Sequence, residues 1–455
     1  MPVMGAAAVA FYLMARAMAR QACRRLRVPG AQTGRIRLRF RGRMSLLIIA
    51  LLAAGRFSIS TLGFGQILFY HTPLGHWPFL LQWSYILPVL ATMALIWRGV
   101  YTFDTAWRHY CDTQRMAMGQ RIFPWGSAGR YVWRNVRLVG SICLSLTVFS
   151  AVYGWVVDAL AGQSIGGMPV LHPVVMASLI CLPVFWIFYP YLLVRSMTTS
   201  PLPPGPLRDR LIAAARSHRV RINDIRIIHT FHSVANAAWI GTLLPPRYIL
   251  LTDRVVDDFP ADQVEDIFAH EVGHGYHRHA TWYLLMLLSI IFLFQLIQIG
   301  LQNGPGVDNS AQPLGVFVLM FILILIFGKL SRISEYQADW FAARHWAKRS
   351  GEPCPPVVGP PGTDAAPSPT AALVSGAELG SAALKTLADV NRMRTDRTGL
   401  THPSIDDRIS SLYTLATRPL AQNRLGRTAR YWRMAIALAL VLEIVALIYF
   451  STRKP

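Results

Sequence analysis

The stretch Ala269-His270-Glu271-Val272-Gly273-His274 is typical of a metal-binding helix. Side chains four residues apart project from the same face of a helix, so His270 and His274 would stand one turn apart. This spacing suits two ligands of a tetrahedral zinc ion, and Glu271 beside them can serve as a general base. A catalytic zinc site takes a third protein ligand and keeps its fourth position open. The third ligand must therefore come from another part of the chain.

A second stretch, Ser331 to Asp339, supplies two candidates for that ligand. Glu335 and Asp339 are again four residues apart and would share one helix face. One of the two could bind the metal while the other orients a ligand histidine through a hydrogen bond to its ring. A purely structural pair of histidines would need no such carboxylates. The two stretches together predict one zinc ion per chain.

The composition indicates a membrane protein. Of the 455 residues, 53% are hydrophobic and only 15% are charged, and the mean hydropathy is positive. These values exclude an ordinary soluble domain. The five cysteines are scattered, odd in number and without a CxxC pair. A disulfide scaffold or a cysteine-based zinc site is therefore not expected.

Apolar runs of about 20 residues predict the membrane spans. We expect seven, at roughly 44–70, 79–97, 138–157, 171–194, 282–300, 314–328 and 434–450. Residues 1–43 carry ten arginines and no acidic residue. Their apolar part comes before most of the positive charge, which is the reverse of a cleaved signal peptide. This favours an interfacial helix and a basic arm on anionic lipid, with a short extra span in residues 1–22 as the alternative.

The basic residues predict the orientation. The expected loops 71–78, 159–170 and 301–312 contain no lysine or arginine, whereas 41 of the 45 basic residues fall in 1–43, 104–137, 195–280 and 329–433. Basic residues mark the cytoplasmic side of a membrane protein. The net charge of +22 is thus a topology signal, and no nucleic-acid partner is expected. Arginine outnumbers lysine 41 to 4, which hints at a GC-rich bacterial genome and hence a bacterial inner membrane.

The spans and motifs divide the chain into five regions. We expect a fold that is multi-pass and α-helical and carries a mainly α, α+β catalytic domain of the zincin type. Its soluble part would contain a helix at 207–217, strands at 225–228 and 248–251, and helices through both motifs and over 371–394. The regions are a basic arm with four spans (1–196), the first part of the catalytic domain (197–280), a two-span hairpin (281–330), the second part (331–431) with a Pro/Gly-rich loop at 351–370, and a last span (432–455).

Four stretches resemble a known family when they are taken in order. They are Asn236-Ala237 ahead of a strand, the paired-histidine stretch, Ser331 to Asp339, and His402-Pro403 followed by Arg408-Ile409. In these motifs, and in the hairpin between the second and third of them, the chain resembles the membrane gluzincin peptidases. This family includes the HtpX heat-shock proteases and the type-I CaaX prenyl endopeptidases. The resemblance covers about residues 200–420, and the last span is not part of the expected pattern.

The resemblance implies a role for each matched residue. His270, His274 and Glu335 would bind zinc, and Glu271 would be the general base. Three further residues would assist: Asp339 by hydrogen-bonding a ligand histidine, Asn236 by placing the substrate backbone, and His402 by donating to the oxyanion. Asn236 could instead be a simple turn former, and Arg408 would support the site structurally.

Two further histidines and two other peptidase classes fit the sequence less well than this assignment. His277 and His279 do not share the face of His274 as a set, so we expect them in a solvated turn. The metzincin pattern needs Gly at position 277 and His at position 280, where this chain has His277 and Ala280. An intramembrane protease would bury the motif in a span, but the flanking residues here are too polar.

Three functions fit the predicted site. The first is cleavage of membrane or membrane-associated proteins in quality control, at cytoplasmic segments. The second is processing of lipidated C-termini, as in the CaaX branch. The third is a sensor or scaffold that binds zinc or peptide without turnover, which would have no need of Glu271. The expected partners are polypeptide substrates and the lipid bilayer, and the sequence predicts no particular oligomeric state.

Overall fold

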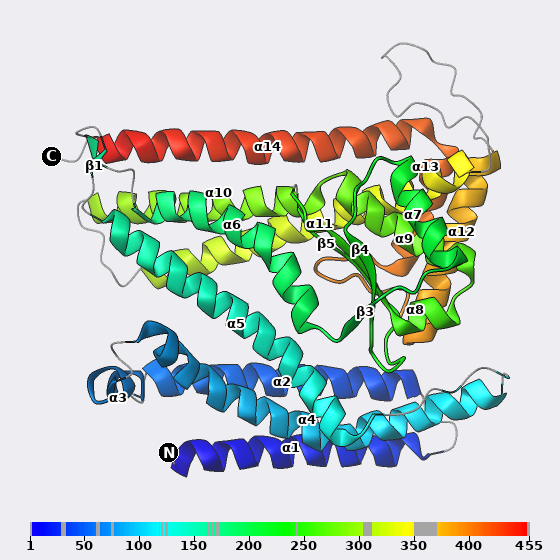
Figure 1. The fold of residues 1–455 in the computed structure, drawn as a ribbon, viewed down its shortest axis with the longest axis horizontal. Coiled ribbons are helices and arrows are strands. Elements are labelled where there is room, and N and C mark those ends of the chain that lie inside the picture. The colour runs from blue at the N-terminus through cyan, green and yellow to red at the C-terminus, as the bar shows by residue number, and fades with distance from the viewer. Residues whose placement is uncertain are drawn as a thin grey trace. The chain divides into compact units, whose positions relative to one another are not determined.

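The structure is a computed structural model of the chain (Figure 1). It describes residues 2–28, 33–60, 64–73, 77–117, 119, 122, 126–161, 164–165, 168–169, 173–242, 244–303, 312–349 and 371–452. The loop expected at 351–370 lies outside the described residues. The chain divides into two compact units. Unit 1 is Met1–Val152 with Tyr191–Thr199 and Thr230–Ser233, and unit 2 is Tyr153–Pro190 with Ser200–His229 and Val234–Pro455.

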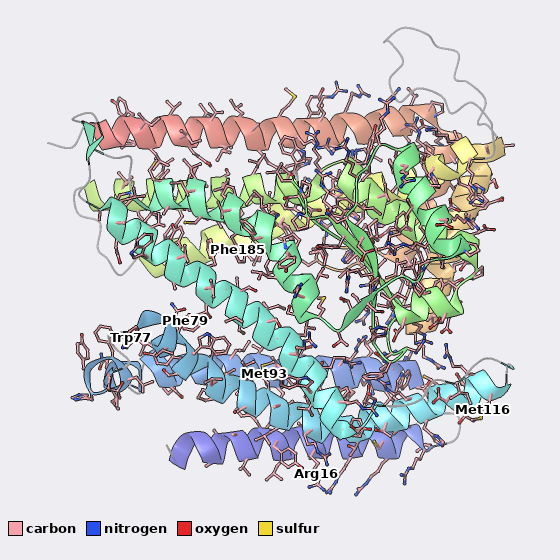
Figure 2. All side chains as sticks on the ribbon, viewed as in Figure 1. Arg16, Trp77, Phe79, Met93, Met116 and Phe185 are labelled. Carbon is pink, nitrogen blue, oxygen red and sulfur yellow. The ribbon has the colours of Figure 1, made fainter. Side chains whose placement is uncertain are left out.

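Unit 1 is helical in its described part. It contains α1 (Pro2–Leu26), α2 (Thr33–Ser60), α3 (Phe64–Tyr70), α4 (Pro78–Ala117) and the larger part of α5 (Ala128–Leu160). Ala15 and Ala19 of α1 are fully buried in the core that α1 shares with α2 and α4. Small side chains let helices approach closely. Arg16 lies on the exposed side of α1 (Figure 2), and the placement of this helix on lipid stays a prediction.

Five helices in the described part of the chain are long and apolar enough to cross a membrane, namely Phe79–Ala117, Ala128–Leu160, Pro173–Ser196, His279–Ile299 and Pro419–Phe450. They correspond to five of the seven expected spans, so a mainly helical fold with five candidate membrane spans is confirmed but the count of seven is not. The span expected at 44–70 includes residues 61–63, which lie outside the described residues, so it stays a prediction. The expected span at 314–328 is helical, but the side chains up to residue 320 lie outside the described set.

Unit 2 holds the predicted catalytic domain. Its helices are α6 (Pro173–Ser196, in part), α7 (Pro206–Ser217), α8 (Asp253–Asp258), α9 (Ala261–Tyr276), α10 (His279–Asn303), α11 (Gln312–Arg349), α12 (Ala371–Asn391), α13 (Ile405–Thr417) and α14 (Pro419–Thr452). Its strands are β1 (Ser164–Ile165), β2 (Met168–Pro169), β3 (Thr199–Pro201), β4 (Asp224–Ile228), β5 (Ala237–Ile240) and β6 (Tyr248–Thr252). The two expected strands and the helices expected at 207–217 and 371–394 are all present.

The main sheet has the strand order β3-β4-β6-β5. Strand β4 pairs parallel with β6, so that Ile225 lies opposite Ile249, and β5 pairs antiparallel with β6. The central strand β6 is a run of apolar residues whose Ile249, Leu250 and Leu251 are fully buried. Such a run suits a strand covered on both faces. Strand β5 is an end strand of the sheet, and this leaves one of its edges to face α9.

Close helix packing brings the two motif helices together. A Cβ atom added at Gly273 of α9 would lie 3.1 Å from the Cα of Ala338 on α11, so the backbones of these helices nearly touch. A Cβ atom at Gly376 of α12 would overlap the carbonyl oxygen of Ala343 on α11. Glycine at these positions lets α11 lie tightly between α9 and α12, and this fixes Glu335 relative to the histidines.

The tight contact at Gly376 leads to a stability prediction. We expect Gly376→Ala to lower the thermal unfolding midpoint in detergent, because backbone must move to admit the methyl group at a cost of about 1–3 kcal/mol. The matched control is Gly380→Ala on the same helix. There the nearest atom is the flexible Cδ1 of Leu412 at 3.2 Å, so we expect a smaller change. Equal midpoints for the two variants would contradict the packing described for α11 and α12.

Candidate metal centre

Helices α9 and α11 bring three ligand atoms to one point. Helix α9 begins directly after Pro260 and carries His270 and His274, whose Nε2 atoms are 3.2 Å apart. Each Nε2 lies 3.7 Å from an oxygen of Glu335 on α11. Zinc bonds of 2.0–2.1 Å in a tetrahedron place neighbouring ligand atoms about 3.3 Å apart. In the described part of the chain, these three residues form a candidate metal-binding cluster.

The protonation state of His274 suits a metal ligand. Burial, together with the neighbouring His270, lowers the pKa of His274 to about 3. The imidazole is therefore neutral at physiological pH and keeps a lone pair to donate, as a metal ligand must. The carboxylate of Glu335 is also almost fully buried, at 5% exposed. Burial would raise its pKa, but the hydrogen bond from His402 and the charge of Arg408 outweigh this and hold the pKa well below its usual range.

Asp339 and Arg408 contact the candidate ligands His270 and Glu335. Oδ1 of Asp339 lies 2.9 Å from Nδ1 of His270, the ring atom that faces away from Glu335. Arg408, in the first turn of α13, binds both oxygens of Asp339, at 2.8 Å through Nε and 2.5 Å through Nη2. Its Nη1 also lies 3.5 Å from Glu335. The structure thus brings Asp339 to a ligand histidine, and it gives Arg408 a larger part in the site than its expected structural support.

The charges of the buried site fit a divalent cation. Three carboxylates, those of Glu271, Glu335 and Asp339, are buried around the single guanidinium of Arg408. When both histidines are neutral, as metal ligands must be, these four groups carry two negative charges, and buried charge is costly unless it is paired. The donor set of two imidazoles and one carboxylate is one that zinc favours. The residues present therefore fit a bound zinc ion in chemistry, spacing and charge.

Glu271 is held by the edge strand. Its Oε2 accepts a hydrogen bond from the backbone N–H of Trp239 on β5, at 2.7 Å. Burial raises the pKa of Glu271, because a carboxylate loses solvation there. Gly275 of α9 makes this approach possible, since a Cβ atom there would lie 2.5 Å from the ring of Trp239. The candidate base and the candidate ligands are therefore positioned by one helix, and β5 fixes the orientation of the base.

The remaining two predicted residues lie at the margin of the centre. His402 precedes α13, and its Nδ1 lies 3.2 Å from Glu335 Oε1, although its side chain is 66% exposed. The hydrogen bond with Glu335 raises the pKa of His402. Asn236 is exposed directly ahead of β5. Its backbone N–H and C=O both pair with Thr252, through Oγ1 and N–H respectively, each at 3.0 Å. The backbone of Asn236 is thus fixed while its side chain is free to face solvent.

Sequence reasoning missed Asn391 and Asp266. The side chain of Asn391, at the end of α12, accepts from the N–H of Ala235 at 3.0 Å and donates to its C=O at 2.7 Å, and so holds the chain that enters β5. No local pattern could reveal a pair 156 residues apart. Asp266 is buried one turn before His270, and burial raises its pKa to about 7. Its spacing of four from His270 was a signal that could have been used.

The expectation of a solvated turn at His277 and His279 is wrong for His279. Its side chain is 3% exposed, and its Nδ1 lies 2.8 Å from Nδ1 of His274. The helix α9 ends at Tyr276, and Arg278 takes a positive φ of 56°. The backbone therefore leaves the path of α9 at Arg278, and this places His279 against His274. The regular spacing of a straight helix did not predict that position.

The comparisons with known proteins agree with this geometry. Residues 209–416 match the model of Peptidase family M48. The Protease HtpX homolog of Aeropyrum pernix is 26% identical over 209 residues, which are 43% of this chain and 64% of that protein. The CAAX prenyl protease 1 homolog of Arabidopsis thaliana is 26% identical over 160 residues, which are 32% of this chain and 38% of that protein. The resemblance found in the sequence is therefore confirmed.

A solved structure shows that the likeness in fold extends further. The crystal structure of S. mikatae Ste24p has a TM-score of 0.51 and 14% sequence identity, and the match covers 90% of this chain and 98% of that one. At this identity the likeness concerns the fold alone. In sequence, the chain spans less than two thirds of the length of the HtpX and CAAX protease relatives given above.

Proposed function

We propose that the protein is an integral-membrane, zinc-dependent endopeptidase, on the premise that residues 209–416 match the model of Peptidase family M48. The observation that carries the proposal is the convergence of His270, His274 and Glu335 beside a buried Glu271. A protein with this fold could lack the residues that catalysis requires. Here two half-buried histidines and the buried carboxylates of Glu335 and Glu271 lie together in one centre.

The proposed mechanism divides the work among four side chains. His270, His274 and Glu335 would hold zinc, which when bound polarises a carbonyl group and makes water nucleophilic near neutral pH. Glu271 would take the proton of the attacking water and return it to the leaving amine. Trp239 N–H keeps this carboxylate in place, and the raised pKa of Glu271 suits a group that must both accept and release a proton.

The substrate would be bound in an extended form. Strand β5 is an end strand, and an extended peptide can add to such an edge through backbone hydrogen bonds. The side chain of Asn236 would help to place that backbone, and His402, exposed beside Glu335, would donate to the oxyanion. A donor of this kind contributes about 3 kcal/mol to transition-state stabilisation. Recognition through backbone favours many substrate sequences over one.

This breadth supports quality control as the role of the enzyme. We favour cleavage of membrane or membrane-associated proteins over processing of lipidated C-termini, which would need prenylated clients. A sensor or scaffold without turnover stays the alternative from another class. An intact Glu271, held by a hydrogen bond to β5, argues against it because a binding module does not need a general base.

The test of the metal centre is the zinc content of a ligand variant. We expect Glu335→Ala to lose zinc from the purified protein, because the remaining two histidines cannot hold the ion and one buried negative charge is gone. Zinc per chain is measured after dialysis against a weak chelator. The matched control is Glu378→Ala, an exposed glutamate on α12, which should keep one zinc per chain. Full zinc content in Glu335→Ala would remove Glu335 from the site.

The proposed orientation places the centre on the cytoplasmic side. The two segments 197–280 and 331–431 would form one catalytic domain, which the hairpin 281–330 interrupts. The support is the distribution of basic residues across the membrane. We expect Ala371→Cys to be shielded from an impermeant thiol reagent in intact cells and labelled after lysis. Ala161→Cys, in a loop expected on the opposite side, should react in intact cells. The parent chain measures the background from the native thiols, and labelling at position 371 in intact cells would overturn the orientation.

A further inference from the structure

A chain of hydrogen bonds leads from His274 away from the candidate metal centre. Nδ1 of His274 lies 2.8 Å from Nδ1 of His279, and Nε2 of His279 lies 3.2 Å from Oε1 of Gln337. The same oxygen of Gln337 accepts from Nη2 of Arg433 at 3.2 Å. These four residues lie on or at the start of α9, α10, α11 and α14. The chain of bonds therefore reaches the C-terminal helix, which runs alongside α10 (Figure 1).

Arg433 determines the direction of every bond in this chain. A guanidinium can only donate, so the Gln337 atom that faces it must be the amide oxygen. That oxygen can only accept, so His279 donates from Nε2, and a neutral imidazole that donates there accepts at Nδ1. His274 must then donate from its own Nδ1. This leaves the lone pair on Nε2 of His274, the atom that lies 3.2 Å from Nε2 of His270.

We propose that Arg433, acting through Gln337 and His279, selects the tautomer and ring orientation of His274 that a metal ion requires. The C-terminal helix is then a positioning element of the metal centre, although it lies outside the matched peptidase region and the motifs. The inference rests on the proposed function in one respect, which is that His274 binds the metal. Hydrogen-bonded partners of this kind orient metal-ligating histidines in general.

Further contacts hold two members of this relay, the hydrogen-bonded chain His274–His279–Gln337–Arg433, in place. The ring of His277 stacks on that of His279, with centroids 5.5 Å apart and an interplanar angle of 18°. The guanidinium of Arg433 lies 5.7 Å from the ring centroid of Trp282 on α10, within the range of a cation–π contact. Further along α14, Ser289 of α10 donates to Glu443 at 2.9 Å. These contacts fix α14 against α10 and keep Arg433 in reach of Gln337.

The relay also explains why Nδ1 of His274 faces the imidazole of His279, while Nδ1 of His270 faces the carboxylate of Asp339. Asp339 accepts from His270 and is itself paired with Arg408. A carboxylate next to Nδ1 of His274 would add another negative charge to those already buried there, at a large desolvation cost. A neutral His279 orients His274 without that charge. The positive charge that completes the chain is kept at its far end, on Arg433.

The experiment measures zinc affinity, by chelator competition, on purified full-length protein. We expect His279→Leu to raise the zinc dissociation constant by about 10- to 100-fold, the usual range for a lost partner of a ligand histidine. His279→Asn keeps an accepting oxygen near the position of Nδ1 and should restore most of the affinity. Arg433→Met should raise the constant by about tenfold, and Arg430→Met, which removes an exposed arginine of α14, should not. A cobalt-substituted sample should show an altered visible spectrum for His279→Leu and Arg433→Met only.

The outcomes separate this inference from the function it rests on. A wild-type protein that binds no zinc contradicts the proposed function. Wild-type zinc affinity and cobalt spectrum in Arg433→Met contradict the relay and leave the proposed function standing. If His279→Leu does not fold, the comparison of Arg433→Met with Arg430→Met decides alone, because both replace partly or fully exposed arginines on the same helix.

Discussion

Replacing Glu271 with glutamine is expected to abolish peptide-bond hydrolysis while zinc stays bound. The introduced amide has the shape of the carboxylate and can still accept from Trp239 N–H through its oxygen, so the local fold is kept. It cannot take a proton from water. General-base catalysis contributes about 10²- to 10⁴-fold to rate, so we expect a loss of at least about a hundredfold. Cleavage of an unfolded membrane-protein substrate in detergent and zinc per chain are measured together.

The control for this variant is Asp262→Asn. It makes the same carboxylate-to-amide change on the same helix, at a side chain that is 53% exposed and pairs with Arg210 away from the centre. Hydrolysis should stay close to the wild-type rate. If Glu271→Gln keeps most of its activity while it holds zinc, the endopeptidase proposal is wrong. If both variants behave as expected, the inactive one can be used to trap substrates and identify them.

The second large effect is expected from removing Arg408. Arg408→Leu leaves the carboxylates of Asp339 and Glu335 buried without their cation, and breaking a buried ion pair costs about 3–5 kcal/mol. A bound divalent ion replaces part of that lost positive charge. We therefore expect a large fall in the thermal unfolding midpoint of chelator-treated protein and a smaller fall in zinc-loaded protein. The quantity to measure is the difference between the decrease in the midpoint without zinc and the decrease with zinc.

Two variants test the cause of that fall. Arg408→Lys keeps the charge but loses the bidentate contact with Asp339, so its midpoint should lie between those of wild type and Arg408→Leu. Arg394→Leu breaks the exposed pair with Asp396 and should have no measurable effect, because solvent already screens that pair. An equal fall with and without zinc in Arg408→Leu would show that Arg408 does not share its charge-balancing role with a metal.

The sequence alone determined the features that depend on short spacing or on composition. His270 and His274 are four residues apart, as are Glu335 and Asp339. Each pair therefore shares one helix face, because a helix repeats every 3.6 residues. Long apolar runs define spans, since the bilayer sets a minimum length.

Only the tertiary structure decided which distant groups meet. Strand β5 is short and half alanine, which has little intrinsic preference for strands, so it forms because β6 is there to pair with it. The contacts of Asn391 with Ala235, of Arg408 with Asp339 and of Arg433 with Gln337 join residues 69 to 156 positions apart. Such contacts depend on how helices pack and on where a helix ends, and a local sequence pattern predicts neither. The turn at Arg278 therefore sends His279 back toward His274, where local helical spacing predicts a solvated position.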